Sequence, residues 1–337
     1  MFVLAGVCSS PALAKVEVAT TPPTTAPSVK KVAVKPAPTH ANVAYGPHER
    51  NTLDVWTVES DTPVPCVIHI HGGAWLSGDK DTVGDLPAVM LKNGIAVVAI
   101  NYRYLEQTII DTGSTHGTGP IQPRANYAEP PVKVPLMDAA RAVQYVRSRA
   151  AEWNIDPQRI GLTGTSAGGC TSLWLTFHDD LADPSATDPV ARQSSKPWCA
   201  AVSGPQTTLD PKVILDWIPN ATYSGHAFGY VWDKSDHTVE LRSFLADREA
   251  VLPWINAYSP EALVTPGDPP VFMAYHDGAP QRGLETKDPT HSSAYAAIIT
   301  PKLEQAGVPY ELYYPGIANP RFKSANEYLI HQLKAER

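Results

Sequence analysis

The chain has 337 residues, a formal net charge of −7 and a hydrophobic content of 43%. This length suits one large domain or two small ones, and the hydrophobic share is ordinary for a globular protein. Because no basic run stands out, nucleic acid is not expected as a partner. No apolar run approaches the roughly 18 residues that would span a bilayer, so no transmembrane helix is expected.

The first residues have the character of a secretion signal. An apolar stretch leads to small residues at Ala12 and Ala14, the A-x-A spacing of a cleavage site, although the usual basic start is missing. We therefore expect residues 1–14 to be a signal peptide and the protein to be exported. Residues 15–41 are rich in Pro, Thr, Ala and Val, which predicts an extended linker that packs no core.

Three cysteines follow this leader: Cys66, Cys170 and Cys199. An odd number in an exported protein permits one disulfide and one free thiol. Each cysteine adjoins an apolar segment, however, which favours small buried side chains over a disulfide.

From about residue 42 onward, short apolar runs alternate with helical patterns. The runs are "NVAYG", "NTLDVWTV", "PCVIHIHGG", "IAVVAINY", "RIGLTGTS", "WCAAVSG", "PPVFMAYHD" and "YELYYPG". The middle runs are continuously apolar, as strands buried on both faces should be. The clearest helix is "PLMDAARAVQYVRSRAAEWNID", with Pro135 in its first turn. The pattern predicts an α/β fold over residues 42–337, with an eight-stranded, mostly parallel sheet and helices on both faces.

Two segments interrupt this alternation. Residues 104–134 hold many Gly, Thr and Pro and are predicted to form a long loop. Residues 204–268 are rich in Trp, Tyr and Phe. A long insertion of this composition predicts a lid or a pocket wall.

The strongest chemical signal is "RIGLTGTSAGG", a G-x-S-x-G motif centred on Ser166. The motif requires a strand before it and a helix after it, and the flanking patterns predict both. Its glycines let the chain turn sharply, which exposes the serine at the start of a helix. The competing interpretation is a glycine-rich turn with an idle serine.

A second signal is "VIHIHGGAWLSGDK", in which His71, Gly72 and Gly73 follow a buried strand directly. The amides of Gly72 and Gly73 could stabilise an oxyanion, together with the amide of Ala167 after the serine. His71 is predicted to orient this loop rather than to act as a base. Trp75 and, from the aromatic insertion, His226 are assigned to the substrate pocket.

Together these segments resemble the α/β-hydrolase superfamily, and within it the exported esterase/lipase branch with hormone-sensitive-lipase-like and feruloyl-esterase-like domains. The matching stretches are "HIHGGAW", "AINYRY", "DAARAVQYVRSRA", "NIDPQRIGLTGTSAGG", "YSPEALVTPGDPPV" and "LEQAGVPYELYYPG". They follow the family's order and cover roughly residues 45–335. The resemblance implies ester hydrolysis through an acyl-enzyme on Ser166.

The later members of the triad depart from the family's pattern. The family places its acid after the seventh strand, where this chain offers Asp277 and Asp288. The histidine should follow the eighth strand, but Asn319 stands near that position. Among eleven histidines, His291 is the preferred replacement, because it should lie at the carboxyl ends of the strands. Alternatively, the stretch from Asp288 to His291 is only a helix start with Asp288 as its cap.

The leading hypothesis is an exported serine carboxylesterase, and analogy with the family suggests acyl or hydroxycinnamoyl esters of carbohydrate as its substrates. Because the usual histidine is missing, an alternative hypothesis is a catalytically impaired α/β-hydrolase that acts as a binding protein. A peptidase of the prolyl-oligopeptidase type shares the sheet, although no propeller repeat is present. No cofactor is expected, and no metal site, since no ligand cluster has zinc-like spacing.

Overall fold

The structure is a computed structural model that describes residues 35–105, 128–230 and 238–335. The predicted signal peptide and residues 15–34 of the predicted linker lie outside the described residues. The last residues of that linker are part of the domain, because the first strand begins at His40 and the Trp56 indole donates to the carbonyl of Pro36 at 2.8 Å.

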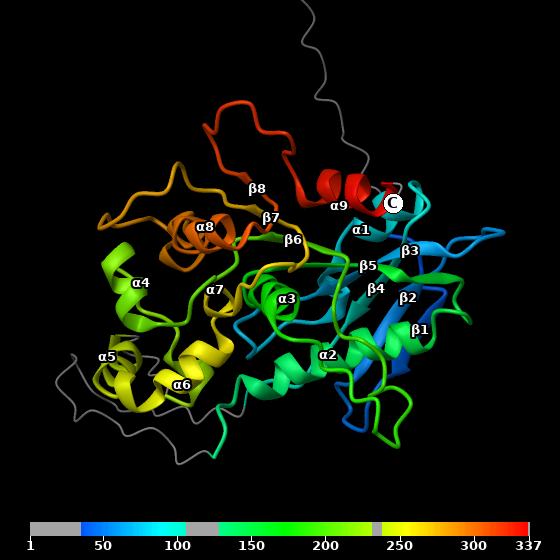
Figure 1. Cartoon of the computed structure of the whole chain (residues 1–337), viewed down its shortest axis with the longest axis horizontal. Helices are drawn as coiled ribbons and strands as arrows, with labels where there is room; N and C mark the ends of the chain where they lie inside the picture. The colour runs from blue at the N-terminus through cyan, green and yellow to red at the C-terminus, as the bar shows by residue number, and fades with distance from the viewer. Residues whose placement is uncertain (1–34, 106–127, 231–237, 336–337) are drawn as a thin grey trace, which may run out of the picture. The chain divides into compact units, whose positions relative to one another are not determined.

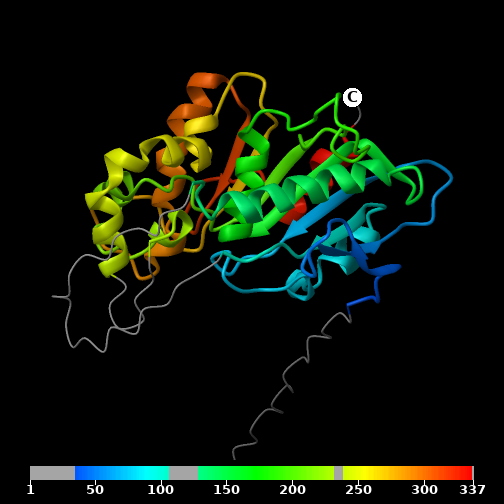
Figure 2. The ribbon, with the colours of Figure 1, turned by 90° about the horizontal axis from the view of Figure 1, so that it is seen from below.

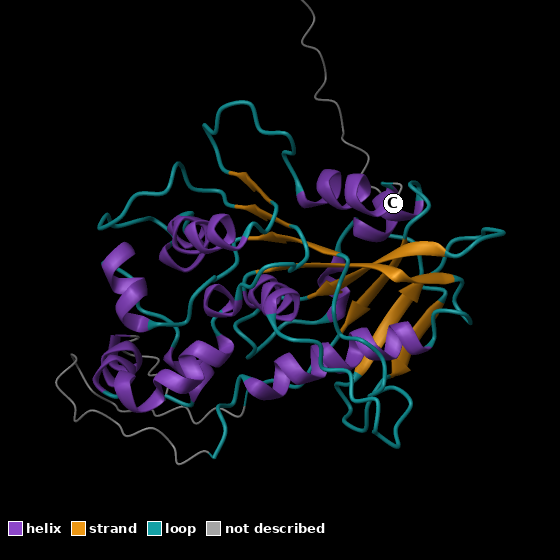
Figure 3. Ribbon diagram, in the orientation of Figure 1, coloured by secondary structure: helices purple, strands orange, loops and turns teal. Residues whose placement is uncertain are grey.

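One eight-stranded sheet organises the domain (Figure 3). Its strands are β1 (His40–Ala44), β2 (Thr52–Trp56), β3 (Val64–Ile70), β4 (Ala96–Ile100), β5 (Ile155–Thr165), β6 (Cys199–Ser203), β7 (Val271–Ala274) and β8 (Tyr310–Tyr313). They lie in the order β1-β2-β4-β3-β5-β6-β7-β8. β2 runs antiparallel to both β1 and β4, and the pairs from β4 to β8 are parallel. Each predicted apolar run overlaps one of these strands, so the predicted sheet is confirmed.

Helices cover both faces of the sheet (Figure 1). The larger core lies under α2 (Lys133–Ser148), α3 (Ala167–Phe177) and α8 (Ala294–Ala306). The smaller core lies under the 3-10 helix η1 (Lys80–Val83), α1 (Leu86–Leu91) and α9 (Ala325–Lys334). Because side chains alternate along a strand, Ile68 of β3 joins the first core and its neighbour Val67 joins the second. This burial on both faces explains why the central strands are continuously apolar.

The aromatic segment between β6 and β7 is largely helical. Its described elements are α4 (Pro211–Trp217), η2 (Gly225–Phe228), α5 (Thr238–Ala246), α6 (Arg248–Tyr258) and α7 (Pro260–Leu263). Figure 2 shows α4, α5 and α6 grouped at one end of the domain, beyond α3. Most of the predicted loop at 104–134 lies outside the described residues, and its last two residues already belong to α2.

The three cysteines of the domain are buried free thiols, as the apolar neighbourhoods favoured. Within the described ranges, no helix has both the length and the apolar character needed to cross a bilayer.

Candidate active site

Ser166 occupies the sharp turn between β5 and α3. Its backbone has φ 57° and ψ −125°, a conformation that is strained for any residue other than glycine. A Cβ atom at Gly164 would lie 2.6 Å from the carbonyl oxygen of Ile70, and one at Gly168 would lie 2.0 Å from the same atom. Both glycines of the G-x-S-x-G motif are therefore required by close backbone packing, and the turn presents the serine at the end of the strand.

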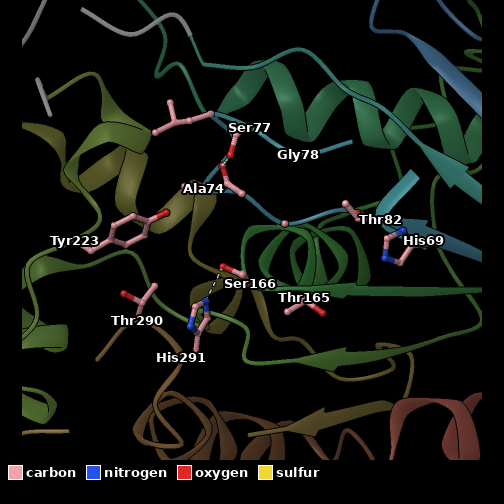
Figure 4. A pocket seen from close by; sticks show the side chains of 13 residues that line it. His69, Ala74, Ser77, Gly78, Thr82, Thr165, Ser166, Tyr223, Thr290 and His291 are labelled. Atoms are coloured by element: carbon pink, nitrogen blue, oxygen red, sulfur yellow. Dashed lines mark hydrogen bonds between the residues drawn. The ribbon is translucent and has the colours of Figure 1, made fainter. Parts of the chain in front are cut away.

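His291 meets this serine from another part of the chain. Its Nε2 atom lies 3.0 Å from Ser166 Oγ (Figure 4). Its Nδ1 atom lies 2.8 Å from Asp288 Oδ2. His291 ends the short 3-10 helix η3 (Pro289–His291) in the connection between β7 and α8. Serine, imidazole and carboxylate thus form one continuous hydrogen-bonded chain, the arrangement that activates a nucleophile.

The carboxylates of Asp277 and Asp288 contact different residues. Asp277 accepts hydrogen bonds from the hydroxyl of Ser292 at 2.9 Å and the amide of Ser293 at 2.7 Å. It therefore fixes the chain that leads into α8. Asp288 makes no side-chain capping bond at the start of η3, so the interpretation as a mere helix cap was wrong. Its carboxylate is the one that contacts His291.

Two further residues, which the sequence did not indicate, support His291 from behind. Gly204 follows β6 with φ +52°, and a Cβ atom there would lie 3.1 Å from His291 Cβ. The buried Gln206 side chain donates to the carbonyl of Thr290 at 2.5 Å. The imidazole is thus held by its own connection and by the segment after the neighbouring strand.

The glycine loop after β3 lies beside the nucleophile. Gly72, Gly73, Ser166 and His291 line one cavity of about 660 Å³. A Cβ atom on Gly72 would lie 2.7 Å from the carbonyl oxygen of Thr165, so the loop passes too close for a side chain. Ala167, the third predicted donor, is the first residue of α3, where backbone amides have no partner within the helix.

His71 serves the loop and not the nucleophile, as expected. It is 1% exposed, stacks on Tyr102 with ring centroids 4.1 Å apart, and bonds the carbonyl of Gly72 through Nδ1 at 2.7 Å. Burial is the main cause that lowers the pKa of His71 to about 4, so the ring is neutral near pH 7.

Trp75 and His226 do not line this cavity, so their assignment to the pocket was wrong. Trp75 is 1% exposed in the larger core, and its indole donates to the hydroxyl of Thr171 in α3 at 2.9 Å. His226 is 4% exposed, and its Nδ1 lies 3.0 Å from the buried carboxylate of Glu240. The aromatic insertion reaches the cavity through Tyr223, whose ring centroid lies 4.4 Å from that of His226.

The cavity extends to both sides of the serine. Figure 4 shows Tyr223 and Thr290 on one side of Ser166, and Thr82 and His69 on the other. Hydroxyl groups dominate its polar lining, and sequence patterns gave no signal for them. The lining residues with a hydroxyl besides Ser166 are Ser77, Thr82, Thr165, Tyr223 and Thr290.

Asn319, at the family's usual histidine position, lies exposed in the loop after β8 with φ 48°. Within the described ranges, no group of three His, Cys, Asp or Glu side chains is arranged to hold a metal ion.

Comparison with known proteins agrees with this geometry. Residues 53–112 and 127–280, well over half of the chain, match the model of the BD-FAE family. Esterase LipQ of Mycobacterium tuberculosis is 25% identical over 272 residues, which cover 79% of this chain and 53% of LipQ. The chain therefore spans about half of LipQ, and less than a third of two other curated relatives among its first matches.

Solved structures share the fold at lower identity. A truncated carbohydrate esterase from gut microbiota superimposes with a TM-score of 0.59 at 20% identity, covering 88% of this chain and 96% of the other. The acetyl ester-xyloside bifunctional hydrolase from Caldicellulosiruptor lactoaceticus gives a TM-score of 0.54 at 22% identity, with 84% of each chain covered. The chain belongs to the BD-FAE family, within the α/β-hydrolase superfamily.

Proposed function

We propose that the protein is a serine carboxylesterase that works through an acyl-enzyme on Ser166. The observation that carries the proposal is the hydrogen-bonded chain from Ser166 Oγ through the imidazole of His291 to the carboxylate of Asp288. Esterase activity among relatives such as LipQ supports the same reaction class.

Each residue of this hydrogen-bonded chain has a role in the proposed reaction. His291 Nε2 takes the proton of Ser166 as the hydroxyl attacks the acyl carbon, and it later gives that proton to the leaving alcohol. Asp288 holds the other ring nitrogen and stabilises the imidazolium that forms. The amides of Gly72, Gly73 and Ala167 would stabilise the oxyanion, and one such donor is worth roughly 3–4 kcal/mol in the transition state. Water then attacks the acyl-enzyme by the same route.

The cavity favours an ester with a hydroxyl-rich part. Because His291 must hand its proton to the leaving alcohol, the alcohol is placed on the side of Tyr223 and Thr290. The acyl group then points toward Thr82 and His69. The hydroxyl side chains of the lining suit the hydrogen-bonding pattern of a sugar. Acyl or hydroxycinnamoyl esters of carbohydrate are therefore the proposed substrates, with the names of two structural neighbours as analogy.

Turnover of p-nitrophenyl acetate tests the reaction. The wild type should release nitrophenol at a steady rate after a burst, and the Ser166→Ala variant should not. A fluorophosphonate probe should label Ser166 alone. A folded protein without turnover or labelling would favour the binding-protein alternative. Faster cleavage of proline peptide amides than of esters would favour the peptidase. Acetylated xylan oligomers and feruloylated arabinose, compared with simple alkyl esters, test the carbohydrate preference.

Export remains part of the proposal. It rests on the apolar leader and the A-x-A spacing at Ala12 and Ala14. Mass spectrometry of the protein recovered from outside the cytoplasm should find an N-terminus at Lys15. Recovery of the uncleaved chain from the cytoplasm alone would contradict export.

A further inference from the structure

Two peptide carbonyls of the glycine loop after β3, those of His71 and Gly72, are held by hydrogen bonds on the side of the loop that faces Tyr102. The hydroxyl of Tyr102 donates to the carbonyl of His71 at 2.9 Å and to that of Gly72 at 3.3 Å. His71 Nδ1 also bonds the carbonyl of Gly72 at 2.7 Å. All described peptide bonds are trans, so the N–H of each peptide points opposite to its C=O. The amides of Gly72 and Gly73 therefore face away from Tyr102, toward the cavity that these glycines line with Ser166.

One arginine on this side of the loop bonds to both Tyr102 and Gly78. Arg50 lies in the turn between β1 and β2, and its side chain is 19% exposed. Its Nε donates to the carbonyl of Tyr102 at 2.8 Å, and its Nη2 donates to the carbonyl of Gly78 at 3.2 Å. Arg50 thus links the residue that carries the phenol to the far end of the glycine loop.

Tyr104 completes the attachment at Gly78. The guanidinium of Arg50 lies 3.8 Å from the centre of the Tyr104 ring, and the Tyr104 hydroxyl donates to the same Gly78 carbonyl. Gly78 has φ +103°, and a Cβ atom there would lie 2.5 Å from His71 Nδ1. Gly78 therefore packs so closely against His71 that a side chain at this position would displace the histidine that holds Gly72.

Arg50 also constrains the proton on His71. Its Nη2 lies 3.5 Å from His71 Nε2. A guanidinium can only donate, so Nε2 must carry the lone pair and Nδ1 the hydrogen. That tautomer is the one that can donate to the carbonyl of Gly72. The arginine consequently favours the tautomer that keeps the Gly72–Gly73 peptide in its orientation.

We propose that Arg50 is a positioning residue that orients the oxyanion amides of Gly72 and Gly73 through Tyr102, Gly78 and His71. The proposal rests on the proposed esterase function for its kinetic consequence, but its structural consequence does not depend on activity. Because the oxyanion exists only beyond the ground state, disorientation of its donors lowers kcat and leaves KM nearly unchanged.

Three variants test the kinetic consequence. Arg50→Met should lower kcat about 10- to 100-fold on p-nitrophenyl acetate while KM changes less than about twofold. Tyr104→Phe, which keeps the ring and loses the bond to Gly78, should shift kcat in the same direction by a smaller factor. Affinity for a boronic acid that mimics the tetrahedral intermediate should fall in parallel with kcat/KM. Methylguanidinium should restore part of the activity of Arg50→Ala.

Arg321 supplies a matched control. It lies 5.1 Å from the ring centre of Phe322, contacts His331 Nε2 at 3.1 Å and pairs with Glu311 at 3.5 Å, all at the other edge of the sheet. Arg321→Met removes a contact with an aromatic ring and one with a histidine nitrogen, as Arg50→Met does, and should leave kcat at the wild-type value.

Hydrogen exchange separates this inference from the proposed function. Arg50→Met should accelerate amide exchange in the peptide that covers residues 70–79, whether or not the protein hydrolyses esters. Unchanged exchange, or an active wild type whose Arg50→Met variant keeps its kcat, would overturn the inference. An inactive wild type with faster exchange in the variant would overturn the esterase proposal and keep the role of Arg50 in the loop.

Discussion

His291 Nε2 lies 3.0 Å from Ser166 Oγ, although the two residues stand 125 positions apart in the sequence. The contact arises because β5 and β7, with β6 between them, are parallel and end at the same edge of the sheet. Ser166 follows β5 directly, and η3 returns the chain after β7 toward it. The imidazole therefore comes from the connection after the seventh strand and not from the loop after the eighth.

His291→Ala is expected to lower kcat by about three to four decades, the scale of losing a triad member while the oxyanion donors remain. Asn319→His should leave kcat unchanged, because this position is exposed in the loop after β8. Steady-state kinetics with p-nitrophenyl acetate measures both. If Asn319→His accelerated the wild type and His291→Ala had no effect, the family's usual position would hold the site instead.

The two aspartates should differ in what their loss changes. Asp288→Ala should lower kcat about 10- to 100-fold at unchanged stability, a smaller loss than for a buried triad acid because its side chain is 59% exposed. Asp277→Ala should instead lower the free energy of unfolding by about 1–2 kcal/mol, since it leaves Ser292 and Ser293 without their acceptor. Urea unfolding and kinetics on both variants decide. The reverse assignment of the two effects would make Asp277 the acid.

Local patterns in the sequence were sufficient to predict the sheet and the sharp turn that carries Ser166. Strands buried on both faces leave continuous apolar runs, and the sharp turn at Ser166 needs its glycines within two residues on either side. These patterns involve residues close together in the chain, so they can be recognised in a single sequence. Gly72 and Gly73 follow β3 directly, and their place beside Ser166 was predictable for the same reason.

The supporting contacts depend on long-range packing. Arg50 reaches the carbonyl of a residue 52 positions away, which no spacing rule indicates. Aromatic density likewise could not tell a pocket wall from a core. His226 is buried against Glu240, and Trp75 is buried against Thr171. Of the described residues in the insertion, Tyr223 alone lines the cavity.

Stability should fall as the pH falls from about 6.5 toward 4. Burial is the main cause that lowers the pKa of both His69 and His71 from 6.5 to about 4 in the folded protein. Between these values the unfolded chain binds more protons, so the stabilisation is complete above 6.5 and is lost on acidification. Each residue contributes roughly 3 kcal/mol at most. The urea midpoint should fall less steeply with decreasing pH, between pH 7 and 4.5, in His69→Asn than in the wild type. An equal pH dependence in the two proteins would contradict the burial effect.

Gly204→Ala should impair catalysis from outside the hydrogen-bonded chain. The new Cβ atom would lie 3.1 Å from Cβ and 3.3 Å from Cδ2 of His291, so the imidazole must move away from its place beside Ser166. We expect kcat to fall about tenfold or more, because misplacement by a fraction of an ångström disrupts proton transfer. Gly307→Ala is the control. That glycine also has positive φ, at +67°, but nothing lies within 4 Å of an added Cβ.

Both variants should lose about 1 kcal/mol of stability from backbone strain. Only Gly204→Ala should slow turnover and labelling of Ser166, and equal kcat values for the two variants would show that His291 does not depend on this support.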